Sequence, residues 1–165
     1  MLVDYMGLEE YFTGEKEGYE TVTFFGPPNH SIRRWMYSFK SYNDMGIVTY
    51  KYHSMKEVVD GEGVEKCKKL ILSHLVKGKY EVEDIPMGTS GDKESGIIFT
   101  GAADNTFRVF SFRETFNGVP ETGAIRLYVR GGLNYSTSID VASTDIEPTN
   151  GIVHSLAYGF TLGQL

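Results

Sequence analysis

The sequence is poor in three features, and each shortage excludes a class of protein. One cysteine, Cys67, occurs in 165 residues, so an internal disulfide and a cysteine-rich metal site are excluded. No apolar run approaches the ~20 residues that a membrane-spanning helix needs, so we expect no membrane span. There is no basic excess either: the formal net charge is −6. Because phosphate recognition needs a basic face, this charge argues against nucleic-acid binding.

The sequence also lacks polar residues at catalytic or metal-binding spacing. None of the four histidines, His30, His53, His74 and His154, has a second ligand at the short spacing that zinc sites use. The densest acidic group, at 81–84, lacks the alternating pattern of a calcium-binding loop. We therefore expect no metal, no cofactor and no catalytic residues.

The remaining composition is typical of one α+β domain. Apolar residues make up 41% of the chain, enough to form a real core at this length. Helical spacing of apolar residues dominates the first half and period-two alternation the second, which favours helices packed on one side of a sheet. We expect helices near 2–12, 29–43, 55–59 and 63–75, and strands at 21–25, 47–52, 97–100, 106–116, 124–130, 138–142 and 151–160.

Two small basic clusters flank apolar helical positions. They are Arg33-Arg34 and the lysines at 66–69. We interpret both as solvated helix faces rather than as a groove, because charged residues on amphipathic helices are normally exposed. Cys67 and Ile71 share the opposite, apolar face, so we expect Cys67 to be an inert thiol in the core.

An informative motif lies near the end of the chain, at 145–154. Asn150-Gly151 is a dipeptide typical of tight turns, because both residue types tolerate positive φ. Ile152 and Val153 then begin an apolar run that contains one imidazole, His154. The pattern predicts a turn that leads directly into a buried strand, with the imidazole hydrogen-bonded to backbone groups.

A second motif, 23–29, predicts a strand followed by a helix. Thr23 lies in a β-branched and aromatic run that two prolines end. Asn29 then occupies the position expected of a helix N-cap. Behind it Ile32, Trp35 and Phe39 fall at helical spacing and predict one apolar stripe.

The third motif, 69–80, places His74 in an apolar stretch that precedes Gly78-Lys79-Tyr80. In order and spacing the three motifs resemble the signatures of the fasciclin-like domain family. The departures are Gly26, Pro28 and Ser73, where the family has alanine, threonine and tyrosine. The residues that match the family's structural signatures are Thr23, Asn29, His74, Asn150, Gly151 and His154.

The resemblance implies a particular architecture. We expect an α+β fasciclin-like fold, a β-sandwich or wedge of roughly seven strands with helices packed on one side. Residues 1–165 would form one such domain. Family members carry more helix before the first signature, so we expect the chain to be a piece excised from a longer secreted or surface protein.

The resemblance also implies a function. The family consists mainly of extracellular or cell-surface adhesion and binding modules that are not enzymes, so we expect a surface protein or a polysaccharide as the partner. In animal members an Asp-Ile pair before the last signature is implicated in integrin binding. Asp145-Ile146 occupies that position, which makes Asp145, Ile146 and Glu147 the candidate partner-binding residues. We expect Asp145 and Glu147 to be solvated on a rigid turn, the alternative being that Asp145 only caps the turn.

Other hypotheses remain open at this level. The chain could be a hydrolase or lyase that uses scattered Asp, His and Glu side chains, or a passive scaffold domain in a multidomain surface protein. Tyr50, Tyr52, Tyr128 and Tyr135 are expected at wet positions, where they would stack on sugars, contact proteins or form ordinary sheet surface.

Overall fold

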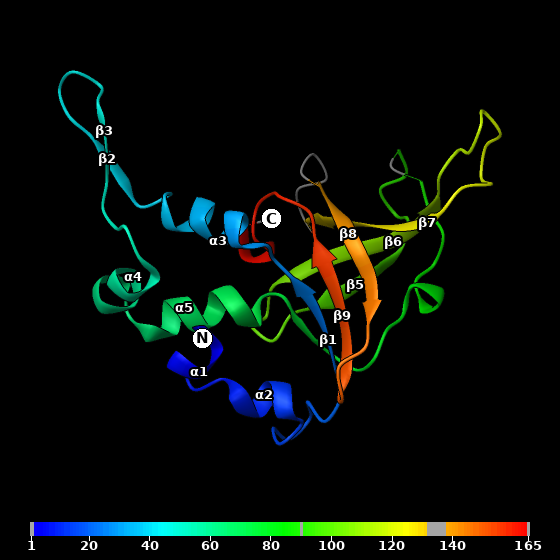
Figure 1. Cartoon of the computed structure of the whole chain (residues 1–165), viewed down its shortest axis with the longest axis horizontal. Helices are drawn as coiled ribbons and strands as arrows, with labels where there is room; N and C mark the ends of the chain where they lie inside the picture. The colour runs from blue at the N-terminus through cyan, green and yellow to red at the C-terminus, as the bar shows by residue number, and fades with distance from the viewer. Residues whose placement is uncertain (1, 90, 132–137, 165) are drawn as a thin grey trace.

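The structure is a computed structural model and describes residues 2–89, 91–131 and 138–164. The first part of the chain is mainly helical and the second part mainly strand, as Figure 1 shows. The helices in the described ranges are α1 (Leu2–Tyr5), α2 (Glu9–Thr13), α3 (Asn29–Met36), α4 (Met55–Glu62) and α5 (Val64–Leu72), with single 3-10 turns at η1 (Val82–Asp84) and η2 (Leu162–Gln164).

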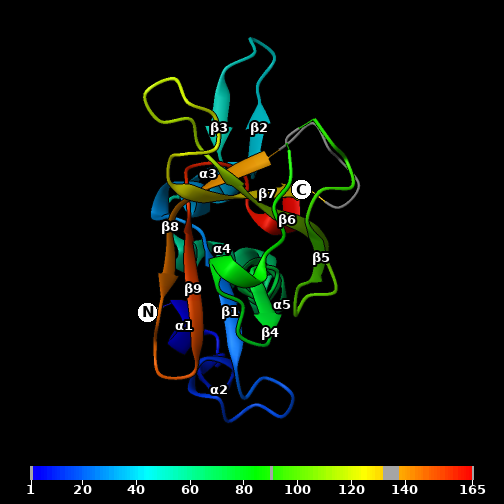
Figure 2. The ribbon, with the colours of Figure 1, turned by 90° about the vertical axis from the view of Figure 1, so that its right-hand side faces the viewer.

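Seven strands form one sheet in the order β4 (Leu75–Lys77), β1 (Val22–Gly26), β9 (Gly151–Leu156), β8 (Ser138–Ile146), β7 (Ile125–Gly131), β6 (Thr106–Arg113) and β5 (Ile97–Thr100). β1 and β9 are parallel, and the other neighbouring pairs are antiparallel. β8 joins the two halves of the sheet because its first residues pair with β7 and the rest with β9. Figure 2 shows β1, β4 and β9 nearly upright and β7 crossing above them. The sheet therefore folds over as a wedge, which confirms the expected α+β architecture.

One hydrophobic core lies inside the folded sheet. Phe25, Phe107, Val129 and Leu156 come from four different strands, and all are buried. The rings of Phe25 and Phe107 pack edge to face with their centroids 5.3 Å apart. Burying a side chain of this size contributes roughly 1.5–3 kcal/mol. Because successive residues of a strand point to opposite faces, the alternating apolar residues decide which face of the sheet packs inside the fold.

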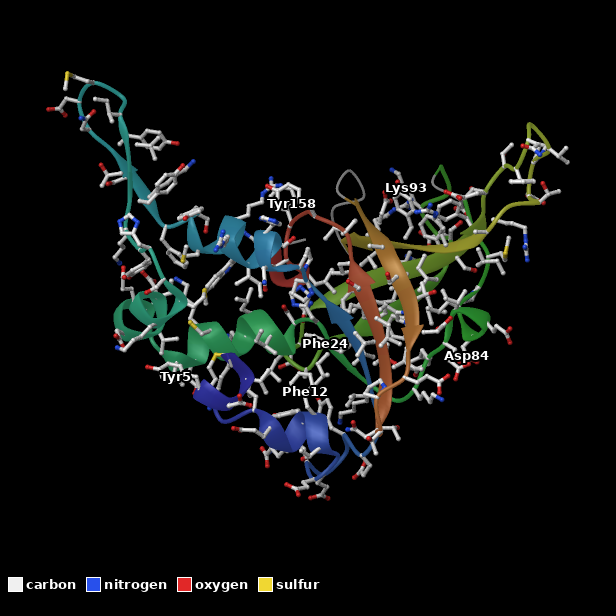
Figure 3. The ribbon with its side chains drawn as sticks, viewed as in Figure 1. Tyr5, Phe12, Phe24, Asp84, Lys93 and Tyr158 are labelled. Atoms are coloured by element: carbon white, nitrogen blue, oxygen red, sulfur yellow. The ribbon has the colours of Figure 1, made fainter. Side chains whose placement is uncertain are left out.

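A second core lies between the helices and the outer side of β1. Successive residues of β1 point to opposite faces, so Phe25 enters the sheet core while Phe24 packs among the helices. Phe12 of α2 meets Phe24 with ring centroids 5.3 Å apart, and Figure 3 shows the two next to each other. Trp35 and Cys67 are buried in the same core, as the sequence predicts. Burial raises the pKa of the Cys67 thiol, which keeps it protonated and unreactive.

Several expectations about element boundaries are wrong, and the expected helix at 29–43 ends at Met36, before the strand Lys40–Tyr42. Gly7 has a φ of +64°, which splits the expected helix at 2–12 into α1 and α2. Asn29 is the first helical residue rather than the N-cap of α3. Pro28 takes the cap position, because its fixed φ suits the extended cap conformation and its carbonyl accepts from the Ser31 N–H. β8 continues to Ile146 instead of ending at 142, because its second half pairs with β9.

A two-stranded hairpin projects from the helical end of the molecule. It consists of β2 (Lys40–Tyr42) and β3 (Val48–Tyr50), and Figure 1 shows it extending beyond α3 and α4. The expected strand at 47–52 is thus one arm of this hairpin. The Asn43 side-chain oxygen closes the turn by accepting the Met45 and Ile47 N–H groups at 3.0 and 2.8 Å.

Candidate functional site

His154, on β9, is fully buried and bonded at both ring nitrogens. Its Nε2 lies 2.9 Å from the Tyr80 carbonyl oxygen, and its Nδ1 lies 3.4 Å from the Asp145 N–H. Because a carbonyl only accepts and an amide N–H only donates, the ring is neutral with its proton on Nε2. Burial lowers the pKa of His154. The prediction of a buried imidazole bonded to backbone groups is confirmed.

His74 makes the same kind of arrangement with the opposite tautomer. Its Nδ1 donates to the Leu70 carbonyl at 2.8 Å, and its Nε2 accepts the Leu162 N–H at 3.0 Å. Burial lowers the pKa of His74 to about 4. The His74 carbonyl also accepts the Phe25 N–H. The imidazole of His74 therefore ties the end of α5 to the C-terminal segment, and the main-chain carbonyl of the same residue ties it to β1.

Thr23 is also buried and bonded on both sides of its hydroxyl. Oγ1 donates to the Gly78 carbonyl at 2.8 Å and accepts the Tyr80 N–H at 2.9 Å. The hydroxyl thereby fixes the segment that leaves β4. Since Tyr80 also bonds to His154, Thr23 and His154 hold the same stretch of backbone from two strands.

The Asn150-Gly151 pair is not the positive-φ turn that the sequence predicts. Neither residue has a positive φ. Gly151 is needed for a different reason: a Cβ at this position would lie 2.0 Å from the Val22 carbonyl oxygen on β1. Asn150 accepts the Val22 N–H through its own carbonyl at 3.1 Å. The dipeptide therefore allows β9 to lie close against its parallel neighbour.

The left-handed residue of this region is Asp145, with a φ of +52°. Between Ser143 and Ile146 three steps of β8 oppose two steps of β9, which is a bulge, and aspartate tolerates the left-handed conformation better than most residues. Its Oδ1 accepts the Val82 N–H at 2.9 Å. Asp145 is exposed, as expected, and its carboxylate also holds the first residue of η1, which supports the alternative that it caps local backbone.

Ile146 and Glu147 are exposed like Asp145, and they differ from it because the Asp145 carboxylate is the one bonded to η1. Both follow the bulge, at the tip where β8 turns into β9. All three residues suggested by the sequence are thus exposed, and their role in binding stays a prediction.

The four tyrosines expected at solvent-exposed positions differ in their exposure. Tyr50 is exposed, and Tyr128 is half-buried and stacked on Phe110 with centroids 5.6 Å apart. Tyr52 is buried, which corrects the expectation: its ring packs in the helical core, and its hydroxyl donates to Glu62 Oε1 at 2.7 Å. Tyr135 lies outside the described residues.

The same Glu62 carboxylate joins the hairpin to the helices. Lys51, just beyond β3, and Lys66, on α5, both lie 2.8 Å from its oxygens. Together with the Tyr52 hydroxyl, these two lysines lower the pKa of Glu62 to about 2. The base of the hairpin is therefore fixed to α4 and α5.

Sequence reasoning missed the exposed apolar side chains of the hairpin. Tyr42, Met45 and Ile47 are 60%, 80% and 56% exposed. The cluster of large apolar residues around Asn43 and Gly46 could have indicated this surface. However, the hairpin forms only because β3 pairs with β2, and the sequence does not predict the strand β2. An exposed apolar group of this kind is a feature of contact surfaces.

Sequence reasoning also missed a groove of about 790 Å³ between α3, the base of the hairpin and the C-terminal segment. Arg33 and Arg34 line it, so they are not merely a solvated helix face as expected. The signal lay in their position beside Tyr37, but the aromatic residues that complete the groove come from 158–160, far along the chain.

Catalytic chemistry finds little support in the described residues. A hydroxyl and an imidazole meet at Ser73 and His74, with Oγ 3.1 Å from Nδ1, but both side chains are buried and bonded to backbone groups. Within the described ranges no three His, Cys, Asp or Glu side chains gather closely enough to hold a metal ion. The longest described helix, α5, has nine residues, and none of the described helices is long and apolar enough to cross a membrane.

Comparison with known proteins supports the fold. No family model and no curated protein matches the sequence. Among solved structures, the chain is similar to a FAS1 domain pair from the insect cell adhesion molecule fasciclin I, with a TM-score of 0.50 and 14% sequence identity. The match covers 95% of this chain and 46% of that one, so the chain spans less than half of its length. The chain has a fasciclin-like fold.

Proposed function

We propose that this chain is a non-enzymatic adhesion or binding module of a secreted or cell-surface protein, and that it recognises a protein or polysaccharide partner. The observation that carries the proposal is the projecting β2–β3 hairpin. Met45 and Ile47 lie at its tip with more than half of their surface in water. Burying such side chains against a partner is favourable by roughly 25 cal/mol per Å² of apolar area.

The fold supports the same proposal. The fasciclin-like fold occurs in a FAS1 domain pair whose parent is a cell adhesion molecule. The hairpin is also fixed at its base by the Glu62 cluster, so less conformational entropy is lost when its tip docks. Ile146 and Glu147, at the β8–β9 turn, form a second candidate contact.

Two other functions compete with this one. A hydrolase or lyase would need an accessible nucleophile and base, and the hydroxyl–imidazole pair at Ser73 and His74 is buried. A passive scaffold would need no contact surface of its own. The first alternative predicts turnover of a substrate, and the second predicts no specific attachment at all.

Attachment of the purified chain to immobilised matrix proteins and matrix polysaccharides tests the proposal. Met45→Ser with Ile47→Ser removes the apolar tip, and we expect attachment to weaken by about tenfold while the melting temperature is retained. Met87→Ser with Ile98→Ser is the matched control, because these side chains are 56% and 57% exposed elsewhere on the surface. Equal losses in both variants, or no attachment by the unaltered chain, would contradict the proposal.

A further inference from the structure

The groove beside α3 is positively charged in a negatively charged protein. Arg33, Arg34 and Lys40 line it together with His30, and among the described residues that line it none is an Asp or Glu. None of these three cations forms an ion pair with a carboxylate among the described residues. The remainder of the surface carries the excess acid that gives the chain its net charge of −6. A local excess of unpaired cations favours an anionic ligand.

Aromatic rings form most of the remaining lining, with Ser38 and Gln164 beside them. Tyr158 is 63% exposed, and Figure 3 shows it at the upper edge of the molecule beside α3. Tyr37 and Tyr50 lie with their ring centroids 4.8 Å apart and connect α3 to the hairpin. Flat exposed rings next to cations suit a ligand that has both apolar faces and negative groups.

The groove is held in place before any ligand binds. The Arg34 guanidinium lies over the Phe160 ring, with its carbon 3.9 Å from the centroid, and also near Tyr158. The segment that carries both rings is tied to α3, since the Gly159 N–H donates to the buried Ser31 hydroxyl at 3.1 Å. Leu162 fixes the segment again through His74. A preformed site loses little entropy on binding.

We propose that this groove binds an anionic oligosaccharide whose pyranose rings carry carboxylate or sulfate groups. The guanidinium groups of Arg33 and Arg34 match the paired oxygens of such groups. The C–H faces of sugar rings pack on exposed aromatic rings such as Tyr158. The volume of about 790 Å³ lies within the range of small-molecule sites and suits a short segment rather than a long polyanion. The inference rests on the proposed binding function and names the ligand class of one surface.

Two other kinds of anion, nucleic acids and acidic peptides, share part of this chemistry but fit the groove less well. A nucleic acid would extend beyond the groove on to an acidic surface, where its phosphates would be repelled. An acidic peptide would satisfy the cations, but its side chains lack the flat C–H faces that four aromatic residues would contact. Both serve as comparison ligands in the test.

Calorimetric titration of the whole chain tests the inference with a uronic acid tetrasaccharide, a sulfated tetrasaccharide, a neutral tetrasaccharide, hexaglutamate and a short oligothymidylate. We expect one or both acidic tetrasaccharides to bind and the neutral one not to bind. The two acidic sugars distinguish carboxylate from sulfate recognition. Affinity should fall as salt rises, because ion pairs supply part of it.

Variants locate the binding. Arg33→Gln with Lys40→Gln should weaken it by about tenfold, and Tyr158→Ala by a similar factor without loss of folding, since its ring is exposed. Lys68→Gln with Lys69→Gln removes the same amount of charge from α5 and should leave the affinity within about twofold. Equal loss in the two double variants would overturn the inference. So would tighter binding of hexaglutamate or oligothymidylate, or binding of the neutral sugar alone. A chain that attaches through its hairpin but binds no acidic sugar would overturn this inference and leave the proposed function standing.

Discussion

The buried polar residues of this chain act on backbone that is distant in sequence. His154 bonds to Tyr80 and His74 to Leu162, partners 74 and 88 positions away. The apolar stretches around both histidines were enough to predict burial. Their partners could not be predicted, because only the tertiary fold brings them together. Each imidazole thus joins distant backbone segments through hydrogen bonds that occupy both of its ring nitrogens.

Replacing either His74 or His154 should lower the stability of the fold. We expect His74→Ala and His154→Ala each to reduce the free energy of unfolding by about 1–3 kcal/mol, because the change leaves buried backbone groups without partners. Thermal melts measure the effect. The exposed His53 provides the matched control, since His53→Ala should leave the melting temperature unchanged. If all three variants melt alike, the two imidazoles do not hold the fold.

Asp145 should contribute to stability through its carboxylate. Asp145→Ala loses the hydrogen bond to the Val82 N–H and places alanine in a left-handed conformation, so we expect a loss of about 1–3 kcal/mol. Asp145→Asn keeps an accepting oxygen and tolerates the same φ, and should lose less. Glu147→Ala is the control, because both residues are exposed but the bond to the Val82 N–H is made by Asp145. Urea unfolding that ranks Glu147→Ala as the more damaging change would contradict the interpretation.

At the scale of elements, the parallel pairing of β1 and β9 is the part of the fold that the sequence described least well. The strands themselves were expected, since β1 is a β-branched and aromatic run and β9 begins with an apolar run. Asn150-Gly151 was assigned to a positive-φ turn, because local sequence cannot show that the Val22 carbonyl of another strand approaches Gly151. The hairpin was half predicted: β3 is β-branched and aromatic, whereas Lys40 and Ser41 of β2 carry no strand signal.

Gly151→Ala should disrupt that pairing. Its Cβ would meet the Val22 carbonyl oxygen at 2.0 Å, so one strand must move, and we expect a loss above about 3 kcal/mol or failure to fold. Gly91→Ala is the control, since nothing lies within 4 Å of a Cβ there and its φ is not left-handed. The denaturation midpoints of the two variants test this prediction. Near-equal midpoints would mean that β9 does not lie this close to β1.

For the whole molecule, the two neutral histidines should make stability depend on pH. The pKa of His74 is about 4 in the folded chain, and an unfolded histidine has a pKa near 6.5. The unfolded chain therefore takes up protons first, and stability present above pH ~6.5 is lost as the pH falls towards about 4. A shift of this size corresponds to about 3 kcal/mol, and His154 changes stability in the same direction.

Urea unfolding across this pH range measures the effect. His74→Gln should be less stable at neutral pH and should lose less stability on acidification than the unaltered chain. Glu62 titrates in a lower window, between about 4.5 and 2, and its contribution is lost there. A pH-independent midpoint from about 7 to about 4.5 would contradict the neutral, buried state of the imidazoles.

The surfaces of the whole molecule could be predicted only in part. Ile146 and Glu147 were found from a local motif, and they are exposed. The groove combines Arg33 with Tyr158, and the hairpin tip is exposed because β2 and β3 extend away from both cores. Neither property is local in sequence. The candidate contacts thus lie at the hairpin, at the groove and at the β8–β9 turn.

The most direct test of the central claim is one attachment assay that compares variants of these three surfaces on the same immobilised matrix proteins and matrix polysaccharides. The variants are Met45→Ser with Ile47→Ser, Arg33→Gln with Lys40→Gln, and Ile146→Ser with Glu147→Gln, and each must melt at the temperature of the unaltered chain. We expect the hairpin variant to lose attachment by about tenfold. Attachment that survives in all three variants, or that is lost only in a variant that no longer folds, would contradict the claim.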